Sequence, residues 1–341
     1  MKEPILEVKN LKKYFPIVQG FLKKHVGDVK AVDGLSFNIR NGETLGLVGE
    51  SGCGKTTASR SIIRLLEPTS GDVFFHMKDQ VVNIPELDQK ELWSTRRYLQ
   101  LIFQDPYASL DARMTIKEII SEPLICFQVG SKKERQERVA ELLELVGLKA
   151  AYMSRYPHAF SGGQRQRIGI ARALALNPEV VIADEPVSAL DVSVQAQILN
   201  LMQDLQERLG LTYLFISHDL GVVQYFCNRV AVMYAGKLVE MTETETLFHN
   251  TKHPYVEALL SAILRPDPHY KLKRMVLKGE VVDSSKKPEG CAFHPRCQYA
   301  KDICSQKIPQ FKNISDKETP HWVACHFSQE LDLNGVNMKL G

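Results

Sequence analysis

The sequence lacks a long apolar run and lacks a strong excess of charge of either sign. No stretch of its 341 residues approaches the roughly 18 consecutive apolar residues that cross a bilayer. The segment Met1–Lys9 scatters charges where a signal peptide would need an apolar core, so we expect a cytoplasmic chain. The net charge of +3 gives no general basic field for nucleic acid, and 44% hydrophobic content excludes a disordered chain.

Cysteine is scarce until the end of the sequence. Three of the seven cysteines are dispersed, and the other four lie after residue 290: Cys291, Cys297, Cys304 and Cys325. In a reducing compartment such a cluster indicates a metal site more readily than a set of disulfides.

The periodicity of the remaining sequence predicts an α/β domain. Short apolar runs at 44–48, 180–183 and 214–216 are typical of strands buried on both faces, and helical patterns cover 131–148, 164–176 and 193–209. This alternation predicts a central parallel sheet. Two further strands are expected near 5–8 and 29–39, and a short helix from His253 to Leu264. An irregular tail, rich in proline and lysine, follows.

The segment Gly49–Thr56 matches G-x-x-x-x-G-K-[ST] between a predicted strand and a predicted helix. Its glycines allow backbone N–H groups to surround phosphate oxygens. Lys55 is expected to contact the β- and γ-phosphates and Thr56 to bind Mg²⁺. The alternative is a chance glycine-rich turn. The residues predicted to bind nucleotide here are Gly49, Glu50, Ser51, Gly52, Cys53, Gly54, Lys55, Thr56 and Thr57. We also expect Cys53, beside Lys55 at a helix N-terminus, to have a lowered thiol pKa and to inactivate the protein when alkylated.

Two further motifs, an acidic pair and a capped helix start, are candidates for nucleotide binding and hydrolysis. Asp184 and Glu185 end an apolar strand, which suits Asp184 to bind Mg²⁺ and Glu185 to polarise an attacking water. Ser161-Gly162-Gly163-Gln164 begins a helix whose free N–H groups form a second anion receptor. A second receptor suggests that ATP is shared between two subunits. An ordinary capped helix is the alternative.

With these motifs the sequence resembles the ATP-binding cassette (ABC) family over residues 1 to about 250. The resemblance implies a P-loop NTPase fold, with a RecA-like parallel sheet, an antiparallel β subdomain and a helical subdomain at about 105–160. It implies further roles: Gln104 as the glutamine that contacts Mg²⁺ and water, Asp191 in the loop that crosses the dimer interface, His218 beside the γ-phosphate, and Phe15, or its neighbour Tyr14, on the adenine ring.

Three segments are similar to the dipeptide, oligopeptide and nickel importer branch of this family. They are Gln104–Leu110, Asp184–Gln195 and His253-Pro254-Tyr255. Within the branch, Gly290–Phe293 is most similar to the F-type ATPase subunit of dipeptide importers. The resemblance implies a small C-terminal domain at 251–341 and a catalytic set of Glu185, His218 and Gln104, with Mg²⁺ held by Thr56, Gln104 and Asp184.

The cysteines of the tail are separated by five, six and twenty residues, which is wider than usual zinc spacing. Four thiolates with one distant member suit a [4Fe–4S] cluster better, and some relatives in the branch carry one. Zinc with His294, His321 or His326 as a ligand is the rival, and unligated buried cysteines are the third possibility.

The resulting prediction is an ATPase at the cytoplasmic face of the cell membrane that powers import of dipeptides or oligopeptides. Its expected partners are a second ATPase subunit, two membrane permease subunits and, indirectly, an extracellular or periplasmic substrate-binding protein, without nucleic acid. A nickel importer of the same branch and a non-transport ABC ATPase are the alternatives. A GTPase is a third class of protein to consider, but a GTPase has no need for a second anion receptor such as Ser161–Gln164.

Overall fold

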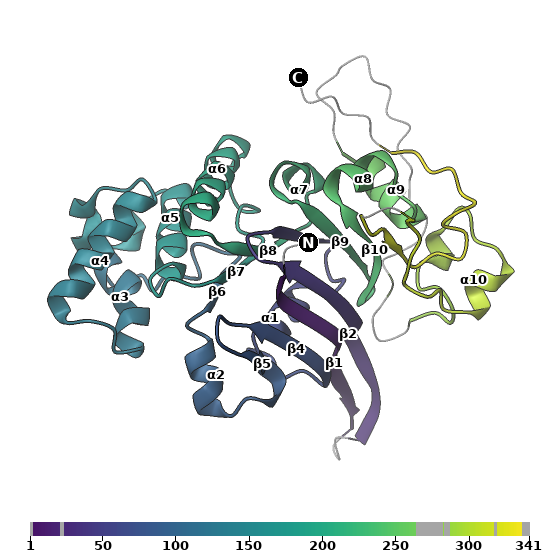
Figure 1. Cartoon of the computed structure of the whole chain (residues 1–341), viewed down its shortest axis with the longest axis horizontal. Helices are drawn as coiled ribbons and strands as arrows, with labels where there is room; N and C mark the ends of the chain where they lie inside the picture. Colours follow the sequence, from purple (N-terminus) through teal and green to yellow (C-terminus); the bar gives the residue numbers. More distant parts are fainter. Residues whose placement is uncertain (1–2, 21–23, 264–281, 283–286, 317–318, 336–341) are drawn as a thin grey trace. The chain divides into compact units, whose positions relative to one another are not determined.

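The computed structural model describes residues 3–20, 24–263, 282, 287–316 and 319–335 (Figure 1). The chain divides into two compact units, which are described separately. Unit 1 consists mainly of Arg40–Glu43 and Glu86–Ile216, and unit 2 of Pro4–Ile39, Thr44–Pro85 and Ser217–Gly341.

The strands of unit 1 form a parallel sheet in the order β8-β7-β6. They are β6 (Leu99–Ile102), β7 (Val180–Asp184) and β8 (Thr212–Ser217). Ile102 of β6 pairs with Ala183 of β7, so these two strands end at the same edge. Every residue of β7 and β8 is buried. Burial on both faces explains why these strands are short continuous apolar runs, as the sequence predicted.

The described residues of unit 1 also form five helices. They are α2 (Gln89–Thr95), α3 (Ile116–Cys126), α4 (Lys132–Leu145), α5 (Gly162–Ala173) and α6 (Val192–Leu209), with the 3₁₀ turns Ala150–Ser154 and Pro157–Ala159. Of these helices, α3 and α4 fall within the range 105–160 that was predicted to be helical. Helices α3, α4 and α5 pack against one another. The helix predicted over 131–148 is α4, which is capped by the Ser131 side chain and ends at Leu145, before Gly147, whose φ of 74° a continuing helix cannot adopt.

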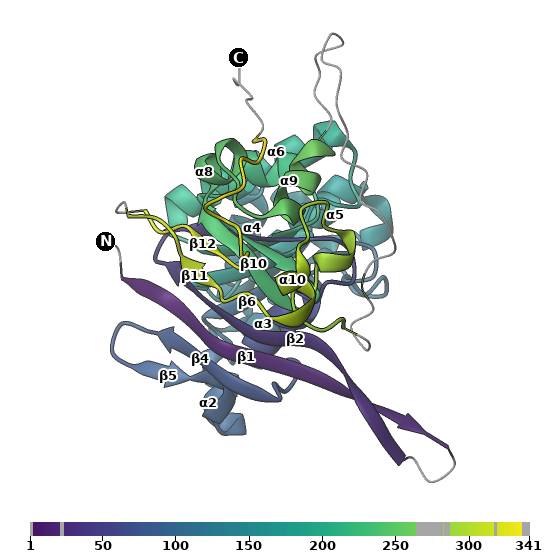
Figure 2. The ribbon, with the colours of Figure 1, turned by 90° about the vertical axis from the view of Figure 1, so that its right-hand side faces the viewer.

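Unit 2 contains a sheet in the order β11-β12-β10-β9-β3. Its strands are β3 (Thr44–Val48), β9 (Arg229–Tyr234), β10 (Lys237–Glu243), β11 (Lys312–Asn313) and β12 (Trp322–Val323). Strands β3 and β9 are parallel, and the other neighbours are antiparallel. Val323 pairs with Glu240, so the tail that we expected to be irregular adds two short strands to this sheet (Figure 2).

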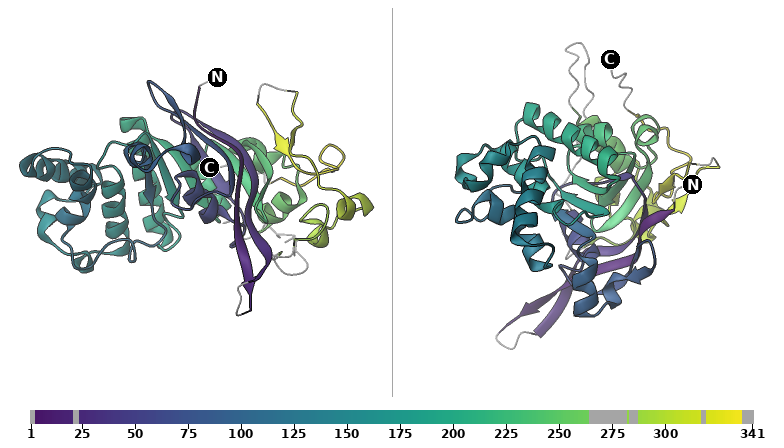
Figure 3. Two further views of the ribbon diagram at one scale, coloured as in Figure 1. Left: turned by 90° about the horizontal axis from the view of Figure 1, so that it is seen from below. Right: turned by 60° about the vertical axis from the view of Figure 1, so that its left-hand side comes forward.

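A second sheet of unit 2 is antiparallel, in the order β2-β1-β4-β5. It consists of β1 (Pro4–Gln19), β2 (Lys24–Arg40), β4 (Ser70–His76) and β5 (Val81–Asn83). Strands β1 and β2 are longer than predicted and extend past the ends of β4 and β5 (Figure 3).

The helices of unit 2 are short. They are α1 (Lys55–Ile62), α7 (Leu220–Phe226), α8 (Thr244–His249), α9 (Pro254–Ser261) and α10 (Asp302–Gln306), with 3₁₀ turns at Ile84–Glu86, at the border with unit 1, and at His294–Arg296. The helix predicted from His253 is α9, which ends at Ser261. Its predicted end at Leu264 and the prolines and lysines at 266–274 lie outside the described residues. In the part of the chain that the structure describes, no helix is both long and apolar enough to span a bilayer.

Candidate nucleotide site and the cysteine cavity

The predicted phosphate loop connects β3 to α1 in unit 2. Gly52 and Gly54 have φ values of 80° and 106°, in the left-handed region that favours glycine. A Cβ at Gly54 would lie 2.1 Å from the carbonyl oxygen of Ala31, and one at Gly49 would lie 2.2 Å from that of Met233. No side chain fits at either position. The loop therefore needs its glycines both for their conformation and for close packing of the backbone.

Lys55 is 95% buried, and its ammonium group contacts the loop itself. Nζ donates to the carbonyl oxygen of Gly49 at 2.7 Å and to that of Glu50 at 3.0 Å. These bonds hold the charge beside the loop until an anion replaces them. Thr56 and Thr57 are half-buried in the first turn of α1, where we expected groups that contact a metal ion and phosphate.

The prediction that the thiol of Cys53 has a lowered pKa is wrong. Cys53 is 4% exposed and its Sγ lies 3.9 Å from Nζ of Lys55. Burial raises the pKa of this thiol, and the nearby ammonium of Lys55 lowers it by less. The proximity of Cys53 to a lysine and a helix N-terminus, which lowers a thiol pKa, can be inferred from sequence. Burial in the tertiary structure raises the pKa of Cys53, and this effect is larger.

The two aromatic candidates for the adenine site differ in their surroundings. The hydroxyl of Tyr14 donates to Asp33 at 2.6 Å, and burial together with this bond raises the pKa of Tyr14 to about 12. Phe15 is 37% exposed, and the ammonium of Lys13 lies 5.1 Å from its ring centroid. Phe15 thus offers exposed ring surface, and Tyr14 belongs to a polar cluster of unit 2.

Unit 1 brings three predicted residues to the ends of β6 and β7. Asp184 is the last residue of β7 and is 2% exposed, and Glu185 follows it with a φ of 47°. This left-handed conformation is uncommon for a residue with a side chain and is found disproportionately at functional sites. Gln104 follows β6, and its Nε2 donates to Oε2 of Glu185 at 3.1 Å.

The Ser161–Gln164 motif begins α5 as predicted. The Ser161 hydroxyl accepts from the Gln164 N–H at 3.4 Å, and the Gln164 side chain accepts from the Ser161 N–H at 3.1 Å, which forms a capping box. Gly162 and Gly163 occupy the first turn. A Cβ at Gly163 would lie 2.4 Å from Cγ1 of Val194 in α6, so the motif also requires glycine for helix packing.

The remaining motif residues lie at helix starts. Asp191 is the N-cap residue of α6 in unit 1, where it is exposed. His218 follows β8 and precedes α7, and it is exposed as well. The structure thus divides the predicted set between its units: the phosphate loop, Tyr14, Phe15 and His218 belong to unit 2, and the others to unit 1.

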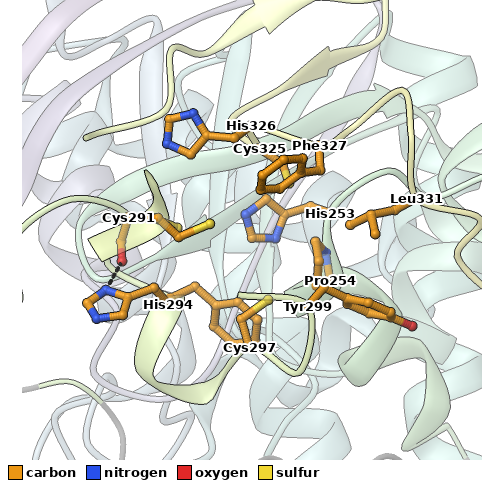
Figure 4. A pocket seen from close by; sticks show the side chains of 12 residues that line it. His253, Pro254, Cys291, His294, Cys297, Tyr299, Cys325, His326, Phe327 and Leu331 are labelled. Atoms are coloured by element: carbon orange, nitrogen blue, oxygen red, sulfur yellow. Dashed lines mark hydrogen bonds between the residues drawn. The ribbon is translucent and has the colours of Figure 1, made fainter. Parts of the chain in front are cut away.

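The four cysteines of the tail line one small cavity of unit 2, with about 20 Å³ of free volume. Figure 4 shows Cys291, Cys297 and Cys325 around it, together with His294 and His326, and Cys304 also lines it. Burial raises the pKa of Cys297 to about 11 and that of Cys325 to about 12. Of the three histidine candidates, His321 is not a lining residue and instead lies 2.7 Å from Glu240.

The cysteine cavity does not present a formed metal site. Within the described ranges, no group of three or more His, Cys, Asp or Glu side chains is arranged to hold a metal ion. A volume of 20 Å³ has room for about one water molecule. The four thiols supply the donor atoms that a thiolate-bound metal group needs, but among the described residues they are not gathered into a group that could hold a metal ion.

Sequence reasoning missed two residues that contact the phosphate loop. Arg296, from the cysteine-rich tail, forms an ion pair with Glu50, and the Tyr255 hydroxyl accepts a hydrogen bond from the Glu50 N–H. Tyr255 belongs to the His253-Pro254-Tyr255 segment, which gives no indication of a contact with the loop, and Arg296 belongs to no recognised motif and lies 246 residues from Glu50. No local signal could have found this contact.

Comparison with known proteins covers nearly the whole chain. Residues 32–188 match the ABC transporter family, and residues 239–304 match the family "Oligopeptide/dipeptide transporter, C-terminal region". The oligopeptide transport ATP-binding protein AppF of Bacillus subtilis is 54% identical over 327 residues, covering 95% of this chain and 98% of the relative. A putative peptide import ATP-binding protein of Brucella ovis is 48% identical, covering 94% and 97%.

Two solved structures of ATP-binding cassettes are also similar to this chain. The dimeric ATP-binding cassette MJ0796, bound to ADP and phosphate, has a TM-score of 0.61 and 31% identity, covering 70% of this chain and 98% of that one. The cassette cbiO1 of Clostridium perfringens, part of an ABC transporter complex, has a TM-score of 0.61 and 27% identity, covering 72% and 91%.

A glycine-rich phosphate loop after a parallel strand, in a chain that also carries the Ser161–Gln164 helix, defines an ATP-binding cassette, a class of P-loop ATPase that binds ATP and Mg²⁺. The chain belongs to the ABC transporter family, and within it to the ATPases that carry an oligopeptide/dipeptide transporter C-terminal region.

Proposed function

We propose that this chain is the ATP-hydrolysing subunit of a membrane importer of oligopeptides or dipeptides. The observation that carries the proposal is the combination of two family matches in one chain with full-length relatives named for oligopeptide transport and peptide import. Nickel import by the same branch is the alternative within the family, and a non-transport ATPase is the alternative outside it.

The experiment is deletion of the gene and complementation in the native cell. Native chain should restore uptake of labelled dipeptides and oligopeptides, and the Lys55→Ala variant should not. Restored nickel uptake with unchanged peptide uptake would favour the nickel alternative. No change in either uptake would contradict a transport function.

We infer the following roles for the motif residues. The loop Gly49–Thr57 surrounds the phosphates, with Lys55 on the β- and γ-phosphates. Phe15 stacks on adenine, because its ring is exposed and the Tyr14 hydroxyl is engaged with Asp33. Mg²⁺ is held by Thr56, Asp184 and Gln104.

The same proposal assigns the hydrolytic step to Glu185 and His218. Glu185 orients the attacking water as general base, and the hydrogen bond from Gln104 holds its carboxylate. His218 contacts the γ-phosphate. The Ser161–Gln164 helix and Asp191 serve the ATP bound by the opposite cassette, since an exposed capped helix start presents N–H groups to an anion from outside.

We propose that the chain works with a second ATPase subunit, two permease subunits and, indirectly, a substrate-binding protein, peripherally at the cytoplasmic face of the membrane. In this arrangement 1–250 forms the cassette, with helices at 105–160, and 251–341 the C-terminal region. The cassette MJ0796 forms a dimer and cbiO1 belongs to a transporter complex, which supports the assembly. Affinity purification from detergent-solubilised membranes should recover permease subunits. Recovery of the chain alone would contradict this part.

We further propose that Cys291, Cys297, Cys304 and Cys325 hold a [4Fe–4S] cluster, with zinc as the rival. Four thiols around one cavity support the proposal through the chemistry of the donor set. The thiol side chains would have to gather around a common centre to hold it. Iron, sulfide and zinc are measured on protein purified without oxygen. Four irons and four sulfides per chain would support the cluster, whereas stoichiometric zinc without sulfide would contradict it.

A further inference from the structure

Arg296 forms a two-point ion pair with Glu50 of the phosphate loop. Its Nη1 lies 2.7 Å from Oε2 and its Nη2 lies 3.1 Å from Oε1 of the carboxylate. The side chains are 7% and 23% exposed. Paired, largely buried contacts of this geometry are among the stronger hydrogen bonds in proteins. Arg296 therefore restrains a residue of the nucleotide site from a distant part of the chain.

Aromatic side chains enclose this ion pair. The Tyr234 hydroxyl lies 3.4 Å from Nη1 of Arg296, and the Tyr255 hydroxyl accepts from the Glu50 N–H at 2.9 Å. The rings of Tyr234 and Tyr255 both pack on Phe293, at centroid distances of 5.3 and 5.4 Å. Glu50 is thus held twice, by its carboxylate and by its backbone nitrogen.

Arg296, which pairs with Glu50, and Phe293, which packs on the tyrosines, belong to one short stretch. We call it the cysteine segment and define it as residues 291–297. It begins and ends with lining cysteines of the cavity and contains Phe293 and Arg296. Its 3₁₀ turn, His294–Arg296, places Arg296 directly before Cys297. A few covalent bonds therefore separate Cys297, in the wall of the cysteine cavity, from Arg296, whose ion pair with Glu50 reaches the phosphate loop.

The restrained residue is also a contact of the predicted phosphate-binding lysine. Nζ of Lys55 donates to the Glu50 carbonyl oxygen at 3.0 Å. A change in the position of Glu50 would move the backbone on which Lys55 rests.

We propose that Arg296 is a positioning residue for nucleotide binding, and that through it the cysteine segment sets the affinity of the phosphate loop for MgATP. The proposal rests on the proposed role of Gly49–Thr57 as the ATP phosphate site. Two physical effects act in the same direction. The guanidinium neutralises a carboxylate close to where a polyanion binds, and it orders the loop before binding, so less entropy is lost when ATP arrives.

The test measures MgATP dissociation constants of the purified full-length chain and its variants with a fluorescent ATP analogue. Arg296→Ala should weaken binding about 10-fold, because it leaves Glu50 charged and the loop untethered. Arg296→Lys should weaken it about 3-fold, since an ammonium keeps the charge but loses the two-point geometry. The double variant Glu50→Gln/Arg296→Ala should bind at least 3-fold tighter than Arg296→Ala alone, since the unpaired carboxylate is gone. In ATPase assays Arg296→Ala should raise KM more than it lowers kcat.

A matched control, Tyr299, lies two residues after the cysteine segment. The Tyr299 hydroxyl donates to Glu257 at 3.1 Å, which also ties the tail to α9 but does not reach the loop. Tyr299→Phe should keep MgATP affinity within 2-fold of native, and thermal unfolding of each variant checks that the fold is kept.

Three results would overturn the proposal: native affinity in Arg296→Ala, an equal loss in Tyr299→Phe, or no recovery in the double variant. The Lys55→Ala variant separates this proposal from the one on which it rests. If Lys55→Ala bound MgATP as tightly as native protein, the assignment of the loop itself would fail. If only Lys55→Ala lost binding, the loop would stand and the role of Arg296 would fall.

Discussion

The side-chain amide of Gln104 donates a hydrogen bond to the carboxylate of Glu185, although 81 residues separate the two in the sequence. The contact exists because β6 and β7 are adjacent parallel strands that end at the same edge, so the residues that follow them meet. The φ of 47° at Glu185 turns the chain sharply after Asp184. The register of β6 and β7 and the left-handed conformation of Glu185 therefore bring the neutral side-chain amide of Gln104 into hydrogen-bond contact with Glu185, the proposed general base.

The first prediction concerns this pair. Glu185→Gln should retain MgATP binding and lower kcat at least 100-fold, because an amide cannot accept the proton of water. Gln104→Ala should lower kcat about 10-fold. In the Glu185→Gln background it should have almost no further effect, since both residues act on one step. Steady-state ATPase assays check this, with exposed Glu207→Gln in α6 as control. Additive losses would contradict a shared role.

The second prediction concerns helix packing at the Ser161–Gln164 motif. Gly163→Ala should destabilise the protein by about 1–3 kcal/mol, because its Cβ would overlap Cγ1 of Val194. Val194→Ala should restore part of the loss. A Cβ at Gly169 of the same helix would meet no packing neighbour within 4 Å among the described residues, so Gly169→Ala should leave stability unchanged or raise it. Urea unfolding distinguishes the two glycines. Equal effects at both would show that packing against α6 is not the cause.

The third prediction separates the two aromatic candidates. Phe15→Ala should weaken ATP binding about 5-fold by removing a stacking surface, and Phe15→Trp should retain it. Tyr14→Phe should leave ATP affinity nearly unchanged but lower thermal stability, because the charged Asp33 loses a hydrogen-bond donor. Titration with a fluorescent ATP analogue and thermal unfolding report the two properties separately. A larger affinity loss in Tyr14→Phe than in Phe15→Ala would reverse the assignment.

The fourth prediction concerns acid stability and Asp33. Its carboxylate lies 3.2 Å from Nζ of Lys237 and 3.5 Å from that of Lys287. Burial raises the pKa of Asp33, but the Tyr14 hydroxyl and these lysines together lower it below the usual value near 4. A lowered folded-state pKa stabilises the native state above pH 4, and this stabilisation is lost as the pH falls through the folded value.

Native protein should therefore lose stability more steeply below pH 4 than Asp33→Asn, which cannot titrate at this position. Asp79→Asn, a change at an exposed residue, serves as control and should follow the native curve. Denaturant unfolding between pH 5 and pH 3 checks the slopes. Parallel curves for native protein and Asp33→Asn would contradict the assignment.

The fifth prediction follows from the burial of Cys53. Iodoacetamide at neutral pH should modify the exposed Cys126 before Cys53, because a buried thiol with a raised pKa reacts slowly. ATPase activity should persist while Cys53 is intact, and Cys126→Ser should abolish only the fast reaction. Mass spectrometry of the modified sites is the measurement. Fast loss of activity with Cys53 labelled first would restore the prediction made from sequence.

The sequence by itself determined the elements whose signals are local. A phosphate loop needs glycine at fixed spacings, a buried parallel strand needs a short apolar run, and a serine followed three residues later by a glutamine is typical of a capped helix start. The segments at Gly49–Thr56, Val180–Asp184 and Ser161–Gln164 satisfy these conditions with neighbouring residues, so they could be predicted.

Only the tertiary structure decided what depends on contacts between distant residues. Proximity to Lys55 predicted a reactive Cys53, but packing buried it and reversed the direction of its pKa shift. The tail looked irregular because its strands are two residues long, and they are defined by pairing with other strands: β12 pairs with β10, and β11 pairs with β12. The ion pair of Arg296 with Glu50 has no local signal, because an arginine specifies a charge and not the partner that folding brings within reach.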